Sequence, residues 1–157
     1  MNKKDAAVSL YNDGFHCSQA VLSAFTEETG ITEKQARLLG GCFGAGMKKG
    51  EVCGACTGAL MVLGLLYGQT EKGDTASKIR AYDAAEAFLD RFAERNGSYR
   101  CNDLLGCDIR TEEGVQYARS RNLFRTLCPK MVEEAVGILE EIIREHGQRK
   151  EEAPWQP

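Results

Sequence analysis

The chain has 157 residues, a length that fits one domain with a core large enough to fold without disulfides. Its net charge of −3 and the lack of a long basic stripe argue against nucleic acid as a partner. We expect no membrane insertion, because the first residues lack the apolar core of a signal peptide and the longest apolar run, residues 59–67, is too short to cross a bilayer. Seven cysteines are many for this length, and in the reducing cytoplasm where we place the protein they favour metal or redox chemistry over structural disulfides.

Apolar residues recur with helical spacing along most of the chain, and no stretch alternates with the period of a strand. Glycines mark the expected helix ends, and Thr32 with Gln35 has the spacing of a capping box. The sequence therefore predicts an all-α fold, a compact multi-helix bundle that forms a single domain over residues 1–146, with a polar tail at 147–157 that we expect to fray. The expected helices are residues 3–13, 18–28, 32–39, 52–67, 74–95, 98–105, 111–127 with a break near residue 120, and 128–146.

Residues 52–67 are expected to form a buried central helix, because this segment is apolar nearly all round. Gly54 and Gly58 are four residues apart, which indicates that another element packs closely on that face. The preceding residues 40–50 form a glycine-dense loop that carries Cys42 and could fold over a cofactor. The long helix at 74–95 is predicted to bury one stripe of side chains: Ile79, Tyr82, Ala85, Leu89 and Phe92.

Four of the cysteines share one local setting, the start of a predicted helix, in four separate segments of the chain. The free N–H groups and the positive dipole end of a helix favour the thiolate, which is the form that ligates metals and the form that attacks disulfides. A lone cysteine often serves only as a small hydrophobic residue, but four at helix starts favour a shared site. The four are Cys17, Cys53, Cys101 and Cys128.

Cys53 and Cys56 form a C-x-x-C at the start of the central helix, a spacing that serves both thiol–disulfide chemistry and metal binding. The sequence lacks the βαβ pattern of a thioredoxin fold, the histidine of a C-x-x-C-H haem site and a second C-x-x-C of a zinc ribbon. A basic cluster surrounds Cys128 and either docks an acidic redox partner or is an ordinary solvated helix face. Its members are Arg119, Arg121, Arg125 and Lys130.

Several motifs together resemble the C_GCAxxG_C_C family of small proteins regarded as redox-active. The resemblance runs from about residue 8 to residue 143 and implies an all-helical fold with four family cysteines, which match the same four positions. Some members are similar to split-Soret cytochrome c, in which a related region accompanies haem and iron–sulfur centres. Because this sequence lacks the haem motif, the resemblance implies an iron–sulfur or thiol role. The matching segments are Gly14-Phe15-His16-Cys17-Ser18-Gln19-Ala20-Val21, Cys53-Gly54-Ala55-Cys56-Thr57-Gly58-Ala59, Cys101 with Leu104-Leu105-Gly106, and Cys128.

Three functions are open at this point, and the sequence does not decide whether the protein is an enzyme. The first is an electron-transfer protein that binds an iron–sulfur cluster, or another metal, through the four cysteines, with Cys42, Cys56 and Cys107 as accessory candidates. The second is a thiol–disulfide protein in which Cys53 attacks and Cys56 or Cys42 resolves the mixed disulfide. The third is a structural zinc site or a helical interaction module. The expected partner is another redox protein, and a homodimer is a further hypothesis.

Overall fold

The computed structural model describes residues 1–147. Over that range it contains ten α-helices and no named strand, which confirms the all-α prediction. A short left-handed turn, η1 (Gly46–Gly50), lies between the fourth and fifth helices. Apart from Gly147, the tail that we expected to fray lies outside the described residues. The helices are α1 (Lys3–Asn12), α2 (Cys17–Ser23), α3 (Thr26–Thr29), α4 (Glu33–Leu39), α5 (Gly54–Tyr67), α6 (Thr75–Asn96), α7 (Cys101–Leu105), α8 (Glu112–Ser120), α9 (Leu123–Thr126) and α10 (Cys128–His146).

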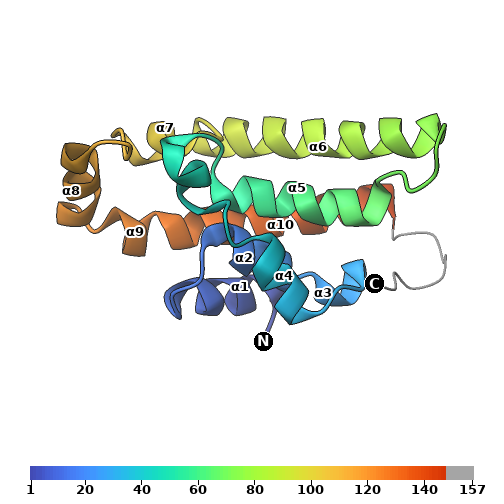
Figure 1. Cartoon of the computed structure of the whole chain (residues 1–157), viewed down its shortest axis with the longest axis horizontal. Coiled ribbons are helices and arrows are strands. Elements are labelled where there is room, and N and C mark those ends of the chain that lie inside the picture. Colours follow the sequence, from blue (N-terminus) through green and yellow to red (C-terminus); the bar gives the residue numbers. More distant parts are fainter. Residues whose placement is uncertain (148–157) are drawn as a thin grey trace.

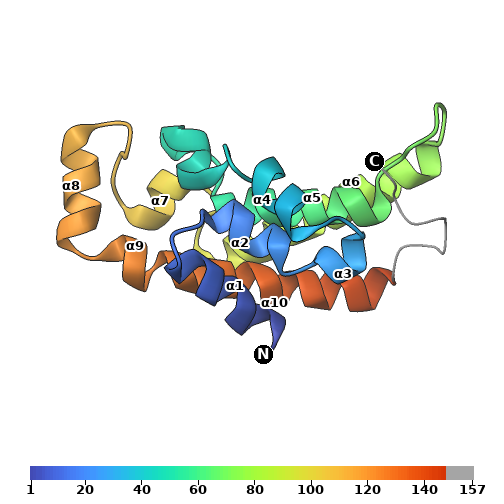
Figure 2. The same cartoon turned by 60° about the horizontal axis from the view of Figure 1, so that its bottom comes forward.

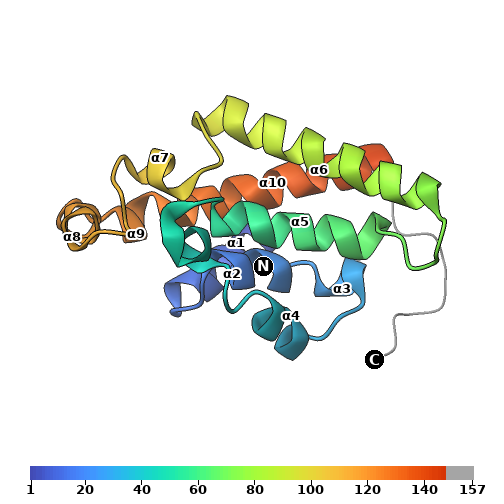
Figure 3. The same cartoon turned by 45° about the horizontal axis from the view of Figure 1, so that its top comes forward.

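Helix α5 lies in the middle of the bundle, as the sequence predicts. It contacts α2, α6 and α10, and Figures 1 and 3 show α6 on one side of it and α2 with α4 on the other. Nine of its fourteen residues are buried, because it has no polar face to turn towards water. The helix begins at Gly54, two residues later than predicted, because residues 51–53 are extended and pair with residues 99–101 through the bridge between Val52 and Arg100.

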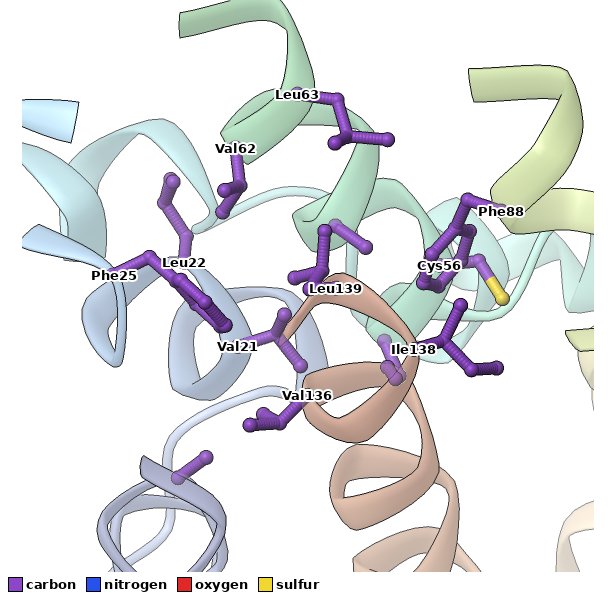
Figure 4. Packing of buried hydrophobic residues seen from close by; sticks show 14 of the residues in the cluster. Val21, Leu22, Phe25, Cys56, Val62, Leu63, Phe88, Val136, Ile138 and Leu139 are labelled. Atoms are coloured by element: carbon purple, nitrogen blue, oxygen red, sulfur yellow. The ribbon is translucent and has the colours of Figure 1, made fainter. Parts of the chain in front are cut away.

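One apolar core joins α2, α5, α6 and α10, and α1 lies across α10 on the outside of the bundle (Figure 2). The buried apolar side chains of α10 are spaced three to four residues apart, so they form one continuous apolar stripe along the helix. Figure 4 shows the central part of the core, where the labelled residues are Val21, Leu22, Phe25, Cys56, Val62, Leu63, Phe88, Val136, Ile138 and Leu139.

The predicted second helix, residues 18–28, is wrong as a single element, because the chain breaks into α2 and α3. Phe25 leaves helical geometry at the break, with φ −117° and ψ 25°. Its side chain is completely buried in the core. The turn at Phe25 therefore places its aromatic ring in the core, and the chain changes direction there instead of continuing as one helix.

The buried stripe predicted for α6 is wrong in its first half. Phe92 is buried as predicted and Leu89 packs against the core, but the structure also buries Ala84 and Phe88, and the side chains of Ile79 and Tyr82 are 54% and 68% exposed. The first turns of α6 face the ring of Tyr67 and the end of α10, and Arg80 covers this surface. Its guanidinium lies 4.5 Å from the centre of the Tyr67 ring and donates a hydrogen bond to the His146 carbonyl. A charged side chain therefore takes the place that the sequence pattern assigned to apolar ones.

The glycine-dense loop is ordered by left-handed backbone geometry at residues 45–50. Ala45, Met47 and Lys48 all have positive φ angles, as do the two glycines of η1. The side chain of Asn102 in α7 fills the space where a Cβ at Gly50 would lie. The loop is therefore held against α7, beside the start of α5, rather than left as a loose connection.

Candidate functional site: a four-cysteine group

Four helix starts gather towards the end of the bundle that carries α7, α8 and α9 (Figure 1). Cys17, Cys101 and Cys128 are the first residues of α2, α7 and α10, and Cys53 is the N-cap of α5. The positions differ from the predicted ones by about one residue, since Cys17 lies inside its helix and Cys53 lies just before its own. We call Cys17, Cys53, Cys101 and Cys128 the four-cysteine group.

Two local contacts bring segments of this group together. Backbone hydrogen bonds join the two extended segments: the Cys53 N–H donates to the Tyr99 carbonyl at 2.8 Å and the Cys101 N–H donates to the Glu51 carbonyl at 2.6 Å. At Gly54, an added Cβ would lie 3.3 Å from the Cβ of Cys17. The missing side chain at Gly54 therefore lets the start of α2 approach the start of α5.

The four sulfurs lie near enough to one another to interact electrostatically. In each of the six pairs that the group can form, the charge of one cysteine acts on the other. Cys56 lies outside this arrangement, because Cys53 is the only sulfur within residues 1–147 that influences its thiol. The charge of Cys107 raises the pKa of Cys101 less than burial and the charges of Cys53 and Cys128 do. The structure thus brings together the four cysteines that start helices and places the accessory candidates around them.

The seven cysteines, all free thiols, differ in burial. Cys17, Cys53 and Cys101 are buried, and Cys128 is half-buried at the edge of the group. Cys56 is completely buried in the apolar core, between Phe88 and Ile138 (Figure 4). Cys42 is exposed in the glycine loop and Cys107 is half-buried. The group therefore has an enclosed interior with one partly accessible member.

The sulfurs form two pairs in which the pKa shifts have opposite signs. A side-chain hydrogen bond with Cys17 lowers the pKa of Cys128 and raises the pKa of Cys17 well above its ordinary value. A side-chain hydrogen bond with Cys56 lowers the pKa of Cys53, whereas burial raises the pKa of Cys56. Burial also raises the pKa of Cys101 to about 12. Each pair offers one sulfur that favours the thiolate and one that keeps its proton.

The start of α5 adds to the stabilisation of the Cys53 thiolate. The backbone N–H groups of Ala55 and Cys56 lower the pKa of Cys53, although no capping hydrogen bond of ordinary geometry forms there. Burial opposes this effect. The sequence predicted a low pKa for Cys53 from its helix start and from the neighbouring Cys56, and the structure agrees in direction, with the Cys56 thiol as the largest cause.

The donor chemistry suits a soft metal or a cluster, since four thiols meet and cysteine thiolates are the ordinary ligands of iron–sulfur centres. Within residues 1–147, no three or more cysteine, histidine or carboxylate side chains lie close enough to hold a metal ion directly. An iron–sulfur cluster occupies more space than a single ion, so its thiolate ligands stand further apart around it. The residues present therefore fit a cluster by their type and number.

No sequence pattern indicates that Tyr11 belongs to the site. Its hydroxyl donates a hydrogen bond of 2.7 Å to the Phe124 carbonyl, 113 residues further along the chain. The proximity of Tyr11 also lowers the pKa of Cys128. No motif marks Tyr11, because its role depends on how α1 packs against the start of α10.

These features define a class of protein: an all-α fold in which four cysteines from four helix starts form one group. The family model described as "Putative redox-active protein (C_GCAxxG_C_C)" matches residues 15–142, so the chain belongs to this family. The resemblance stated from the sequence is confirmed. No curated protein and no solved structure gives a significant match. None of the helices within residues 1–147 has the length and apolar character needed to span a bilayer.

Proposed function

We propose that the four-cysteine group holds an iron–sulfur cluster and that the protein is an electron-transfer protein. The observation that carries this proposal is the mutual interaction of the four family cysteines in all six pairs, with Cys56 and Cys107 at the periphery. A dithiol protein needs two neighbouring sulfurs, whereas a cluster needs four around one volume. When bound, such a cluster supplies one-electron transfer.

The chain prepares this site in three ways. The N-terminal ends of α5 and α10 carry the positive dipole ends of two long helices, which stabilise negative charge at Cys53 and Cys128. Burial of three of the four cysteines keeps water away from the centre. The left-handed loop at residues 45–50 closes the side next to α7. Cys128 is the one half-buried member of the group, so electrons would enter or leave the site most directly there.

Metal and sulfide analysis of anaerobically purified protein is the direct test. We expect a brown protein with charge-transfer absorbance, and iron and acid-labile sulfide in comparable amounts. Colourless protein with bound zinc and inert thiols would instead indicate the structural zinc site, and colourless protein with labile thiols would indicate thiol–disulfide chemistry. Either outcome would reject the cluster.

Thiol–disulfide chemistry is the second candidate, favoured by the hydrogen bond that lowers the pKa of Cys53 next to Cys56. In this alternative the Cys53 thiolate attacks a disulfide of the substrate to form a mixed disulfide. Cys56 then attacks the Cys53 sulfur, so that a Cys53–Cys56 disulfide forms and the substrate leaves as a dithiol. The complete burial of Cys56 suits a resolving thiol. The exposed fraction of Cys53, 6%, limits the access of a protein substrate and argues for the cluster instead.

In metal-free protein, the rate of alkylation of Cys53 should reach half its maximum at a lower pH than that of Cys107. The pKa of Cys53 is lowered by the Cys56 hydrogen bond, whereas burial raises the pKa of Cys107. The midpoint is compared rather than the rate, because the two thiols differ in accessibility. Mass spectrometry of each cysteine across a pH series measures the pH at which its alkylation rate is half-maximal. Equal midpoints would remove Cys53 as a candidate nucleophile.

We propose an acidic redox protein as the partner. Four exposed cations lie on α8, α9 and the start of α10, beside the accessible edge at Cys128, and none of the ion pairs within residues 1–147 involves them. They are Arg119, Arg121, Arg125 and Lys130. Electron transfer to such a partner should slow as salt is raised from low to physiological concentration, and a rate independent of salt would argue against it. Cytoplasmic location and a homodimer remain proposals, which cell fractionation and sedimentation would test.

A further inference from the structure

The side of α5 that turns away from the core is apolar, although the helix lies in the middle of the bundle. Leu60, Met61 and Leu65 are half-buried on this side, and Gly64 between them is exposed. A Cβ added at Gly64 would meet nothing within 4 Å, so no part of residues 1–147 covers the helix there. Because a helix that is apolar all round belongs in an enclosed place, the open side of α5 lacks a partner within the described chain.

Helix α4 extends this apolar side. Leu38 and Leu39 are 71% and 52% exposed. Together with Ile31 and Leu65 they line a groove of about 530 Å³ between α4 and α5. The polar residue of the lining is Gln35, whose side chain is engaged in the cap of α4. A partner in this groove would therefore meet mainly apolar surface.

Helix α6 continues the apolar surface on the other side of α5, through Tyr82, which is 68% exposed. Tyr82 lies two helical turns before Leu89, which packs against the core, whereas Arg91 and Arg95 pair with α10 from the opposite side of α6. Tyr82 is therefore on the side of α6 towards α5. Because the two helices run in opposite directions from the turn at residues 68–74, Tyr82 lies level with the middle of α5. Figure 3 shows α6, α5 and α4 beside one another in this order.

We propose that this surface is the interface of a two-fold homodimer, in which α5 and α6 of one copy pack against the same helices of a second copy. In a two-fold interface the same patch is used on both copies, so it must be complementary to itself. The proposal does not depend on a bound cluster. We call the surface the α4–α5–α6 face and define it by its apolar side chains, which are Leu38, Leu39, Leu60, Met61, Leu65 and Tyr82.

The size of the α4–α5–α6 face agrees with a stable dimer. Its length along residues 57–68 is about 18 Å, and three neighbouring helices spaced about 9 Å apart cover a width of about 28 Å, so the flat footprint is on the order of 500 Å². Side chains project from this footprint, so its accessible area is larger. A stable interface buries about 800 Å² of accessible surface on each partner, which is the area that such a face supplies.

Charges at the edge of the face favour a second copy over an unrelated partner. Lys78 and Glu86 lie one turn before and one turn after Tyr82 on α6, and both are exposed. Neither takes part in an ion pair within residues 1–147. When the α6 helices of two copies lie antiparallel with Tyr82 at the two-fold axis, Lys78 of each copy meets Glu86 of the other. The edge is therefore complementary to itself in the way that a two-fold interface requires.

Charge reversal tests the arrangement, with the dissociation constant of the full-length dimer measured by sedimentation equilibrium at low salt. Lys78→Glu and Glu86→Lys should each weaken the dimer by about tenfold, because both symmetric contacts become repulsive. An equimolar mixture of the two variants should regain the wild-type dissociation constant, since every reversed charge then meets its opposite on the other copy. Recovery on mixing cannot come from a folding defect, because each variant still carries its own substitution.

Tyr82→Ser should weaken the dimer by at least about tenfold, because a tyrosine near the centre of an interface contributes much of the binding energy. Tyr117→Ser is the matched control, since Tyr117 is also exposed but lies on α8, at the other end of the molecule. Three outcomes would overturn the inference. A wild-type protein that is monomeric at its highest soluble concentration would leave the face to another occupant. Charge variants that dimerise like the wild type, or that fail to recover on mixing, would reject the antiparallel arrangement. Equal weakening by Tyr82→Ser and Tyr117→Ser would place the interface elsewhere.

Discussion

Replacement of Cys101 by serine is expected to remove most of the iron and sulfide from the anaerobically purified protein and to bleach its charge-transfer absorbance. Serine is a poor substitute for thiolate at a soft metal centre, and the charges of Cys53 and Cys128 both act on Cys101. A cofactor bound at 100 to 1,000 times its dissociation constant stabilises the folded state by about 3–4 kcal/mol, so the melting temperature should fall as well. Iron and sulfide assays with thermal unfolding measure both effects.

Cys42→Ser and Cys107→Ser are the controls, since each removes one thiol without removing a member of the four-cysteine group. Cys42 is exposed, and Cys107 lies on the periphery next to Cys101. Both variants should keep their colour and their melting temperature. If the Cys107 variant loses as much iron as the Cys101 variant, the assignment of ligands is wrong. If only changes at Cys53 and Cys56 have an effect, the dithiol candidate is the better one.

Much of the fold could be predicted because local signals mark most of the helices. Thr32 and Gln35 form the capping box that the sequence indicated. The Thr111 side chain accepts the N–H of Gly114 at the start of α8, and the expected break near residue 120 occurs at Asn122, which has a positive φ angle. Such boundaries depend on residues a few positions apart, so the sequence shows them directly.

The errors lie where tertiary contacts override local patterns. A continuous helix through Phe25 would satisfy the apolar spacing, but the chain turns at Phe25 and its side chain is buried in the core. The first turns of α6 offered Ile79 and Tyr82 as core residues, and the structure leaves them exposed because Arg80 covers Tyr67 instead. Spacing alone does not say which neighbour a helix face will meet.

The candidate site also has one part that the sequence could predict and another that depends on tertiary contacts. That cysteines begin helices is a local property, and the sequence was enough to select the four of them. Their approach to one another depends on contacts between distant segments, such as the backbone bonds of Cys53 and Cys101 to residues 99 and 51. Tyr11 was missed for this reason, because its partners Phe124 and Cys128 are brought to it by the packing of α1 on α10.

Helix α2 is held at backbone contact on two sides, and this packing fixes the position of Cys17. On one side, a Cβ added at Gly58 would lie 2.7 Å from the carbonyl oxygen of Ser18 and 3.0 Å from its Cα. On the other, a Cβ added at Gly40 would lie 2.9 Å from the backbone nitrogen of Gln19. The buried hydroxyl of Ser18 donates to the Gly40 carbonyl at 2.7 Å. Helix α2 therefore has little freedom to move away from α5.

Gly58→Ala is therefore expected to destabilise the protein, although alanine is the better helix former. Overpacking in a close-packed core costs about 1–3 kcal/mol, and the gain in helix propensity returns about 1 kcal/mol, so we expect a net loss of up to about 2 kcal/mol in the free energy of unfolding. Gly64→Ala in the same helix is the matched control, because nothing lies within 4 Å of its added Cβ, and it should stabilise by up to about 1 kcal/mol. Denaturant unfolding of both variants in metal-free form measures the difference. A Gly58→Ala protein as stable as Gly64→Ala would show that α2 can move away from α5, and the close contact would then not be what holds Cys17 in the four-cysteine group.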